Sequence, residues 1–197
     1  DIIEEARADL FGLYYIADEK MVQLGLLPNI KAHESQYYTY MMNGLMTQLV
    51  RIKPGNQIEE AHMRNRALIA NWVMAHAHGA VEWHKRAGFT YIKVNDYAAL
   101  RQLFAHLLAE VQRIKSEGDR AEAKVLVERY GIVLDRALHE EVLHRYAALD
   151  ISPYKGFINP RMTPVYGKGG EIVDVELDYT ETFEHQMLRY SDEYGLL

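Results

Sequence analysis

The sequence contains no cysteine, no long apolar run and no excess of positive charge. Without cysteine, the 197-residue chain has no disulfide, no thiolate zinc site and no cysteine nucleophile. No apolar run reaches the length of about eighteen residues that a membrane-crossing helix needs. The formal charge of −6 argues against a general nucleic-acid binder, because such proteins usually carry a basic excess. We therefore expect neither a nucleic-acid partner nor a membrane partner.

The residues that are present are ordinary for a globular protein, with 49% hydrophobic and 25% charged. A chain of this length can bury a sizeable core in one domain or slightly more. It begins Asp1-Ile2-Ile3, inside a helical pattern and without a signal-like segment. We interpret it as a piece of a longer protein whose natural N-terminus lies elsewhere. The expected compartment is the cytoplasm, and a periplasmic or secreted location stays open.

Apolar residues recur every three or four positions along most of the chain, which predicts a mainly α-helical fold. The predicted helices end at glycine, proline or capping residues and cover about residues 1–24, 33–52, 58–78, 97–116, 120–130 and 136–149. Between them, residues 81–94 predict two short strands around a turn at Gly88.

The composition changes after Asp150, where prolines and glycines separate short apolar runs. This spacing predicts a β hairpin that turns at 167–170, followed by a terminal helix from about Thr182 to Tyr194. We therefore expect a multi-helix lobe with a small β hairpin over residues 1–150. Residues 151–197 are expected to supply a short β segment and a terminal helix that belong to a second lobe.

Three acids open the first predicted helix. Glu5 and Asp9 stand four residues apart and share a face, whereas Glu4 lies about 100° around the helix from Glu5. Spacing alone favours a solvated acidic face at the positive end of the helix dipole. However, Phe11 and Tyr15 lie off the main apolar stripe, so the helix is apolar nearly all round. A buried helix of this kind would need a cation or a metal beside its acids.

Two histidine patterns have ordinary explanations. His62 shares a broad face of its helix with Asn65, and Arg66 follows one turn later. A single histidine in such a place is usually hydrogen-bonded in the core. His139 and His144 form an H-E-x-x-x-H string, but they stand five positions apart, which places them about 140° from each other around a regular α-helix. They could share one metal only across a π-bulge, so we reject them as a zinc motif.

Four short strings, in order along the chain, carry a more specific signal. They are Glu-Glu-Ala-Arg-Ala-Asp at 4–9 with Gly-Leu-Tyr at 12–14, Glu-Ala-His-Met-Arg-Asn-Arg at 60–66, Ile-Lys-Ser-Glu-Gly-Asp at 114–119, and Lys-Gly-Phe-Ile-Asn-Pro at 155–160. Together they resemble the dipeptidyl peptidase III family of zinc exopeptidases: its acidic motif, its A-H-M-x-x-R segment, its K-S-x-G-D turn and the stretch where its chain leaves the helical lobe. The likeness covers residues 1 to about 180.

The resemblance implies a zinc-dependent parent enzyme that releases dipeptides from the N-termini of short peptides. It assigns Glu5 to the zinc as a protein ligand. It assigns Glu4 and Asp9 to hold the ring nitrogens of two histidine ligands. Zinc accepts such nitrogen and carboxylate donors and activates a bound water, so the chemistry is consistent.

The resemblance also implies three residues that act on the substrate. His62 matches a histidine that hydrogen-bonds the scissile peptide or its tetrahedral intermediate. Arg66 matches an arginine in the cleft, and Lys155 matches, more loosely, a basic residue that faces the cleft from the other lobe. A donor beside a developing oxyanion can contribute on the order of 3 kcal/mol.

The chain departs from the family pattern in two respects. First, it contains no H-E-x-x-G-H string. In the family this string carries the two histidine ligands and the glutamate that activates water. Second, Asp9 stands where a glutamate is more common in the family. We therefore expect this C-terminal part of the catalytic region to be inactive alone, with its zinc absent or incomplete. The parent is expected to be monomeric, and self-association of the fragment through exposed interface stays open. The alternative is a non-catalytic helical binding module on the same scaffold.

Overall fold

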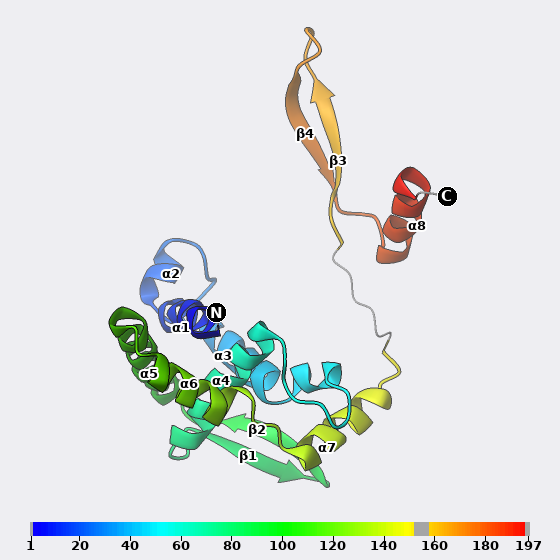
Figure 1. Cartoon of the computed structure of the whole chain (residues 1–197). Coiled ribbons are helices and arrows are strands. Elements are labelled where there is room, and N and C mark those ends of the chain that lie inside the picture. The colour runs from blue at the N-terminus through cyan, green and yellow to red at the C-terminus, as the bar shows by residue number, and fades with distance from the viewer. Residues whose placement is uncertain (1, 152–157, 196–197) are drawn as a thin grey trace. The chain divides into compact units, whose positions relative to one another are not determined.

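The computed structural model describes residues 2–151 and 158–195 and has a mainly α fold (Figure 1), as the sequence predicts. Contacts between residues divide the chain into two compact units, Asp1–Asp150 and Ile151–Leu197. Each unit has one antiparallel two-stranded sheet among its described residues. In the part of the chain that the structure describes, none of the helices is long and apolar enough to cross a membrane.

The first unit is built mainly from helices with capped ends. Its α-helices are α1 (Ile2–Ile16), α2 (Glu19–Gln23), α3 (Ala32–Leu45), α4 (Ala61–His76), α5 (Tyr97–Glu117), α6 (Arg120–Leu126) and α7 (Arg136–Ala147). A 3-10 turn, η1 (Thr47–Arg51), follows α3, and a π turn, η2 (Val127–Gly131), extends α6. The side chains of Asp96 and Asp135 accept hydrogen bonds from the first turns of α5 and α7, which fixes where these helices begin.

The prediction of one helix up to about residue 24 is wrong. α1 ends at Ile16, and Asp18 starts α2 by accepting a hydrogen bond of 2.9 Å from the Lys20 amide. An aspartate side chain that binds nearby backbone amides favours a new helix start over a continuous helix. The expectation of all-round burial also fails, because Phe11 is 53% exposed and Tyr15 is 40% exposed.

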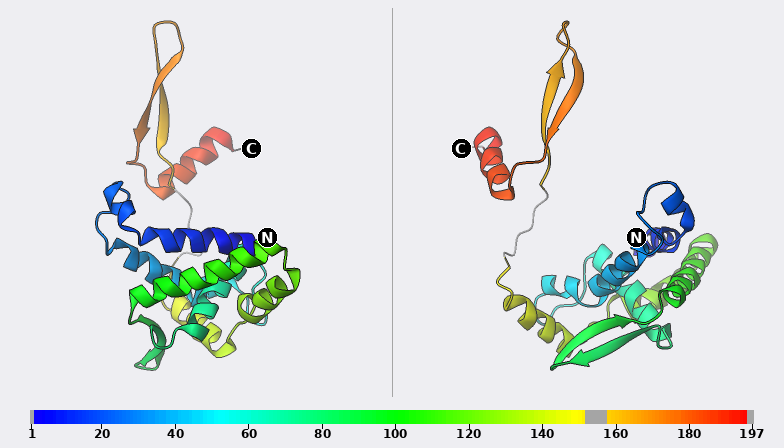
Figure 2. Two further views of the ribbon diagram at one scale, coloured as in Figure 1. Left: turned by 90° about the vertical axis from the view of Figure 1, so that its left-hand side faces the viewer. Right: turned by 180° about the vertical axis from the view of Figure 1, so that it is seen from behind.

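α1 and α5 lie side by side and run in opposite directions (Figure 2). At one end the Lys115 ammonium of α5 lies 3.2 Å from the Glu4 carboxylate of α1. At the other end the Arg101 guanidinium of α5 donates a hydrogen bond of 3.1 Å to the carbonyl of Tyr14. These contacts tie both ends of α1, so the direction of its acidic face is set by the scaffold.

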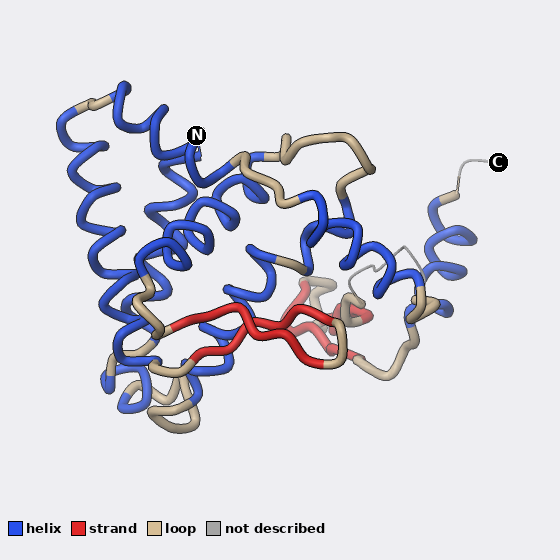
Figure 3. The backbone as a smooth tube through the Cα atoms, turned by 90° about the horizontal axis from the view of Figure 1, so that it is seen from below, coloured by secondary structure: helices blue, strands red, loops and turns tan. Residues whose placement is uncertain are grey.

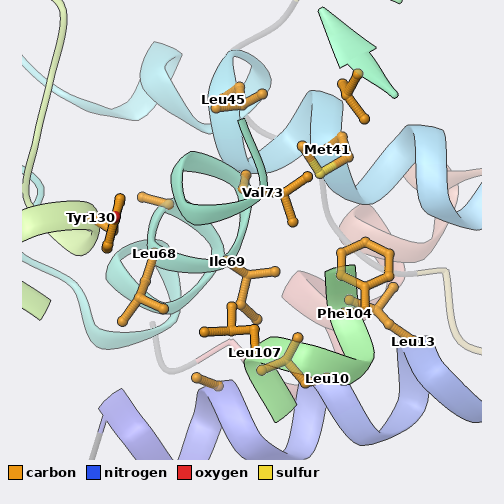
Figure 4. Packing of buried hydrophobic residues seen from close by; sticks show 14 of the residues in the cluster. Leu10, Leu13, Met41, Leu45, Leu68, Ile69, Val73, Phe104, Leu107 and Tyr130 are labelled. Atoms are coloured by element: carbon orange, nitrogen blue, oxygen red, sulfur yellow. The ribbon is translucent and has the colours of Figure 1, made fainter. Parts of the chain in front are cut away.

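The core of the first unit lies where α1, α3, α4 and α5 meet (Figure 4). Its members are apolar side chains with little or no exposure, including Leu10, Tyr37, Met41, Leu68, Ile69, Val73, Phe104 and Leu107. α3 packs tightly on α4 at Gly44, where a Cβ atom would lie 2.5 Å from the carbonyl oxygen of Arg66. Only glycine fits there, so Gly44 allows the close approach of the two helices.

The predicted hairpin is confirmed as β1 (Val81–Arg86) and β2 (Phe89–Val94), which Figure 3 shows as strands beside the helices. Ala87 and Gly88 make the turn with positive φ angles of 50° and 83°. The hairpin is fixed to α7 by Glu141, whose carboxylate accepts hydrogen bonds of 2.7 Å from both the amide and the hydroxyl of Thr90.

The second unit contains β3 (Arg161–Tyr166), β4 (Ile172–Asp178) and α8 (Phe183–Tyr194), which agrees with the predicted hairpin and terminal helix. Gln186 is fully buried and joins α8 to the segment before β3. Its side chain accepts a hydrogen bond of 3.0 Å from the Asn159 amide and donates one of 2.6 Å to the Asn159 carbonyl. The glutamine thus holds both backbone groups of one residue.

Candidate functional site

Both oxygens of Glu4 are occupied by cations in the structure. Oε1 pairs with the Arg7 guanidinium one turn along α1, and Oε2 is 3.2 Å from both Arg7 Nε and Lys115 Nζ. Hydrogen bonds from Arg7 and Lys115 lower the pKa of Glu4 to about 2. The carboxylate is therefore ionised over the whole physiological range and connects α1 to α5.

Glu5 faces α4 and lies beside His62. Its Oε2 atom is 3.2 Å from His62 Nδ1, and the two side chains are 38% and 58% exposed. The structure shows no hydrogen bond or ion pair from the other oxygen, Oε1, to any described residue. The carboxylate is thus held on one side by a histidine and open on the other.

His62 takes its place because α4 begins immediately before it. Glu60 caps the helix, and its carboxylate accepts hydrogen bonds of 2.9 Å from the His62 amide and 3.0 Å from the Met63 amide. These amides lower the pKa of Glu60, since they stabilise its charged form. A residue in the first turn of a capped helix has a fixed backbone, so the exposed His62 ring extends from a rigid base.

Asp9 lies one turn after Glu5 on α1 and is held by two neutral donors. Its Oδ2 atom accepts a hydrogen bond of 2.8 Å from the Tyr40 hydroxyl of α3 and one of 2.7 Å from the Asn65 amide of α4. Asn65 is 1% exposed. Burial, followed by the charge of Asp9, raises the pKa of Tyr40 well above its ordinary value, and Arg66 opposes this shift.

Asp9 repeats the pattern of Glu5. Its second oxygen, Oδ1, makes no hydrogen bond or ion pair with the residues that the structure describes. Two carboxylates one turn apart therefore each have one oxygen in contact with a neighbouring side chain and one oxygen that no described residue engages. Glu4 differs from both, because its two oxygens are taken.

Arg66 joins Asp9 and Tyr40 in lining a cleft of about 400 Å³ between α1 and α3. The Arg66 guanidinium makes no hydrogen bond or ion pair with any residue in 2–151 or 158–195. It is a cation that remains available to an anionic or carbonyl group in the cleft. Lys155, predicted to face the cleft from the other lobe, lies outside the described residues.

His139 and His144 have separate environments on a regular α-helix. His139 is buried, and its Nε2 atom lies 3.1 and 3.0 Å from the carbonyl oxygens of Leu49 and Ile52. His144 is exposed. Hydrogen bonding to backbone carbonyls accounts for the buried His139, and the exposed His144 does not join it in binding one metal ion.

The described residues do not complete a metal site. Among residues 2–151 and 158–195, no three histidine, cysteine, aspartate or glutamate side chains are grouped to hold an ion. Zinc usually has four ligands, three of them from the protein in catalytic sites. The open oxygen of Glu5 suits one of those positions, and the remaining donors are not grouped around it.

The structure brings together Glu5, Asp9, His62 and Arg66, and it directs Glu4 toward α5. Sequence reasoning did not assign roles to Tyr40 or Asn65, which position Asp9. Asn65 could have been found, because it lies three residues after His62 and thus on the same side of α4. Tyr40 gave no such signal, since its contact depends on how α3 packs against α1.

Comparison with known proteins gives one clear result. Searching the curated proteins finds no significant match. The sequence pattern of peptidase family M49, the dipeptidyl peptidase III family, matches residues 1–185 of the 197. This range includes the acidic motif, the A-H-M-x-x-R segment and the K-S-x-G-D turn, so the resemblance seen in the sequence is confirmed. The chain belongs to peptidase family M49.

Proposed function

We propose that this chain is the part of a zinc-dependent dipeptidyl peptidase that supplies one metal ligand and the groups that hold the scissile peptide. The observation that carries the proposal is the pair of half-open carboxylates on α1. Glu5 lies 3.2 Å from His62 through one oxygen, and Asp9 accepts hydrogen bonds from Tyr40 and Asn65 through one oxygen. Carboxylates with a second oxygen that no described residue engages suit a metal ligand and a partner for a ligating histidine.

In this proposal Glu5 binds the metal, and the open oxygen of Asp9 accepts a hydrogen bond from a histidine ligand. Glu4 supports the site by holding α1 against α5 through Lys115. The zinc, when bound, supplies an activated water and a Lewis acid. The remaining donors are expected from an H-E-x-x-G-H helix, because the described residues do not group three donors themselves.

His62 and Arg66 act on the peptide in this proposal. The exposed His62 ring can donate a hydrogen bond to the scissile carbonyl. Arg66 offers its guanidinium, which no described residue pairs, to a carbonyl or carboxylate of a peptide in the cleft. Lys155 is also proposed to contact the substrate, because the resemblance matches it to a basic residue that faces the cleft. Short peptides are the proposed substrates.

The test uses the protein translated from the whole reading frame that contains residues 1–197. We expect His62→Ala to lower kcat/KM for dipeptide release by about 100-fold or more, the usual cost of losing an oxyanion donor. Glu5→Ala should lower it further, because a metal ligand is lost. Arg129→Ala is the matched control, since Arg129 is exposed and lies outside the cleft.

Near-normal turnover in both variants would overturn the site assignment. A reading frame without an H-E-x-x-G-H string would favour the non-catalytic binding module. The 197-residue chain alone is proposed to be inactive, because its described residues present one proposed metal ligand, Glu5, and its sequence lacks the H-E-x-x-G-H string that supplies the water-activating glutamate in the family.

A further inference from the structure

A second hollow, of about 440 Å³, lies between the β1–β2 hairpin, α4 and α7 and contains none of the residues assigned to peptide cleavage. Its floor is apolar and includes Leu45, Leu49, Ile58, Leu134 and Leu138. Pockets that hold small organic molecules have volumes of about 300 to 1,000 Å³ and similar apolar linings. The hollow is therefore large enough for a small ligand of its own.

Two groups on β1 border this hollow and have no hydrogen-bond or ion-pair partner among the described residues. Trp83 and Lys85 are two residues apart on one strand, so they face the same side of the hairpin. Trp83 is 42% exposed, although tryptophan is highly buried on average. Neither the indole N–H nor the Lys85 ammonium makes a hydrogen bond or ion pair with the residues in the described ranges.

The acidic groups on the same lining already have donors. Glu141 accepts hydrogen bonds from Thr90 and is 3.2 Å from Arg145. Asp135 caps α7 and accepts a hydrogen bond of 3.0 Å from the Leu138 amide. Of the charged side chains on the lining, Lys85 is thus the one that lacks a partner among the described residues. The lining favours a ligand that brings an anionic acceptor.

We propose that the hollow binds a small carboxylic acid with an apolar body. The apolar body covers the leucine floor and contacts Trp83, and the carboxylate faces Lys85. Burial of the apolar body supplies most of the affinity, because a single exposed ion pair contributes little. The carboxylate supplies the selectivity. This site does not depend on the proposed peptidase activity.

The binding test uses the 197-residue chain with decanoate as the probe and decanamide as the uncharged counterpart. The sequence has two tryptophans, and Trp72 stacks on His76 with ring centroids 4.1 Å apart, away from the hollow. A Trp72→Phe background therefore reports on Trp83 alone. We expect decanoate to change the Trp83 emission saturably with one site, and decanamide to bind several-fold more weakly. The net charge of −6 excludes a general attraction for anions as the cause of that preference.

Two matched pairs of variants locate the ligand. Ala137 is exposed and lines the hollow, so Ala137→Phe should fill it and weaken decanoate binding by about tenfold or more. Ala147→Phe, on an exposed position of the same helix outside the lining, should leave binding unchanged. Lys85→Met should weaken decanoate binding by about two- to fivefold and spare decanamide. Lys93→Met, on the other face of the hairpin, should change neither.

Several results would overturn the proposal. One is the absence of saturable binding. A second is equal binding of decanoate and decanamide, and a third is equal weakening by Ala137→Phe and Ala147→Phe. The four positions of the matched pairs are exposed, so these variants should keep the fold, and circular dichroism verifies this for them and for the Trp72→Phe background.

Discussion

Removing the hydroxyl of Tyr40 should destabilise the first unit by an amount that the structure sets. Tyr40→Phe deletes the hydrogen bond of 2.8 Å to Asp9, and hydrogen bonds to charged groups contribute about 1.5 to 3 kcal/mol. Asn65 still donates to the same oxygen, so the lower end applies. We expect a loss of about 1.5 kcal/mol, which corresponds to about 3 to 6 °C in Tm for a unit of this size.

Urea denaturation of the 197-residue chain measures this loss, with the midpoint shifted and the slope unchanged. Tyr38→Phe is the matched control, because Tyr38 is 37% exposed on the same helix and its hydroxyl donates no hydrogen bond to the residues that the structure describes. It should change the free energy of unfolding by less than about 0.5 kcal/mol. In a double-mutant cycle, Tyr40→Phe should lose most of its effect once Asp9→Ala has removed the acceptor. Equal losses for the two tyrosines, or full additivity with Asp9→Ala, would refute the reasoning.

Three further predictions follow from other contacts. Gly44→Ala should lower the free energy of unfolding of the first unit, measured by urea denaturation, by about 1 to 3 kcal/mol, since the added Cβ meets the Arg66 carbonyl. Gly12→Ala is the matched control: it has open space around it and should be neutral or stabilise by up to about 1 kcal/mol. The folded pKa of Glu4, about 2, is below its ordinary value of 4.5. Its stabilising contribution is therefore present above pH 4.5 and is lost as the pH falls through 2. Glu4→Gln should therefore make the Tm fall less steeply between pH 4.5 and pH 2 than it does in the unsubstituted chain. An unchanged fall of the Tm over this range would contradict the prediction. Elemental analysis of the purified 197-residue chain should find less than about one tenth of an equivalent of zinc, and a full equivalent would revive His139 and His144 as ligands.

Local signals allowed much of the fold to be predicted. Asp96 and Gly118 mark the two ends of α5, the first as a side-chain cap and the second with a φ of 66° that glycine adopts easily. The break after α1 was not predicted, because the apolar stripe continues through Ala17 while the Asp18 side chain starts a new helix. Periodicity reports which face is buried, and it does not report a capping contact that interrupts the helix.

The candidate site was harder to predict, because its contacts join distant parts of the sequence. Asn65 reaches Asp9 over 56 positions, and Tyr40 reaches it over 31. Spacing alone favoured a solvated face for the acids of α1, and the family resemblance was needed to select Glu5 and His62. The structure adds a distinction that neither the spacing nor the resemblance contained. Glu4 has both oxygens engaged, whereas Glu5 and Asp9 each have one oxygen without a contact among the described residues.

The open oxygen of Glu5 is the centre of the account, and zinc retention tests it most directly. The measurement is the zinc content after dialysis of the protein from the whole reading frame, comparing Glu5→Gln with Glu19→Gln. Glu19 is exposed at the start of α2 and lies away from the cleft, so its variant should keep the metal. We predict that Glu5→Gln loses most of its zinc and its dipeptide release together. Full zinc content and normal turnover in Glu5→Gln would contradict the account.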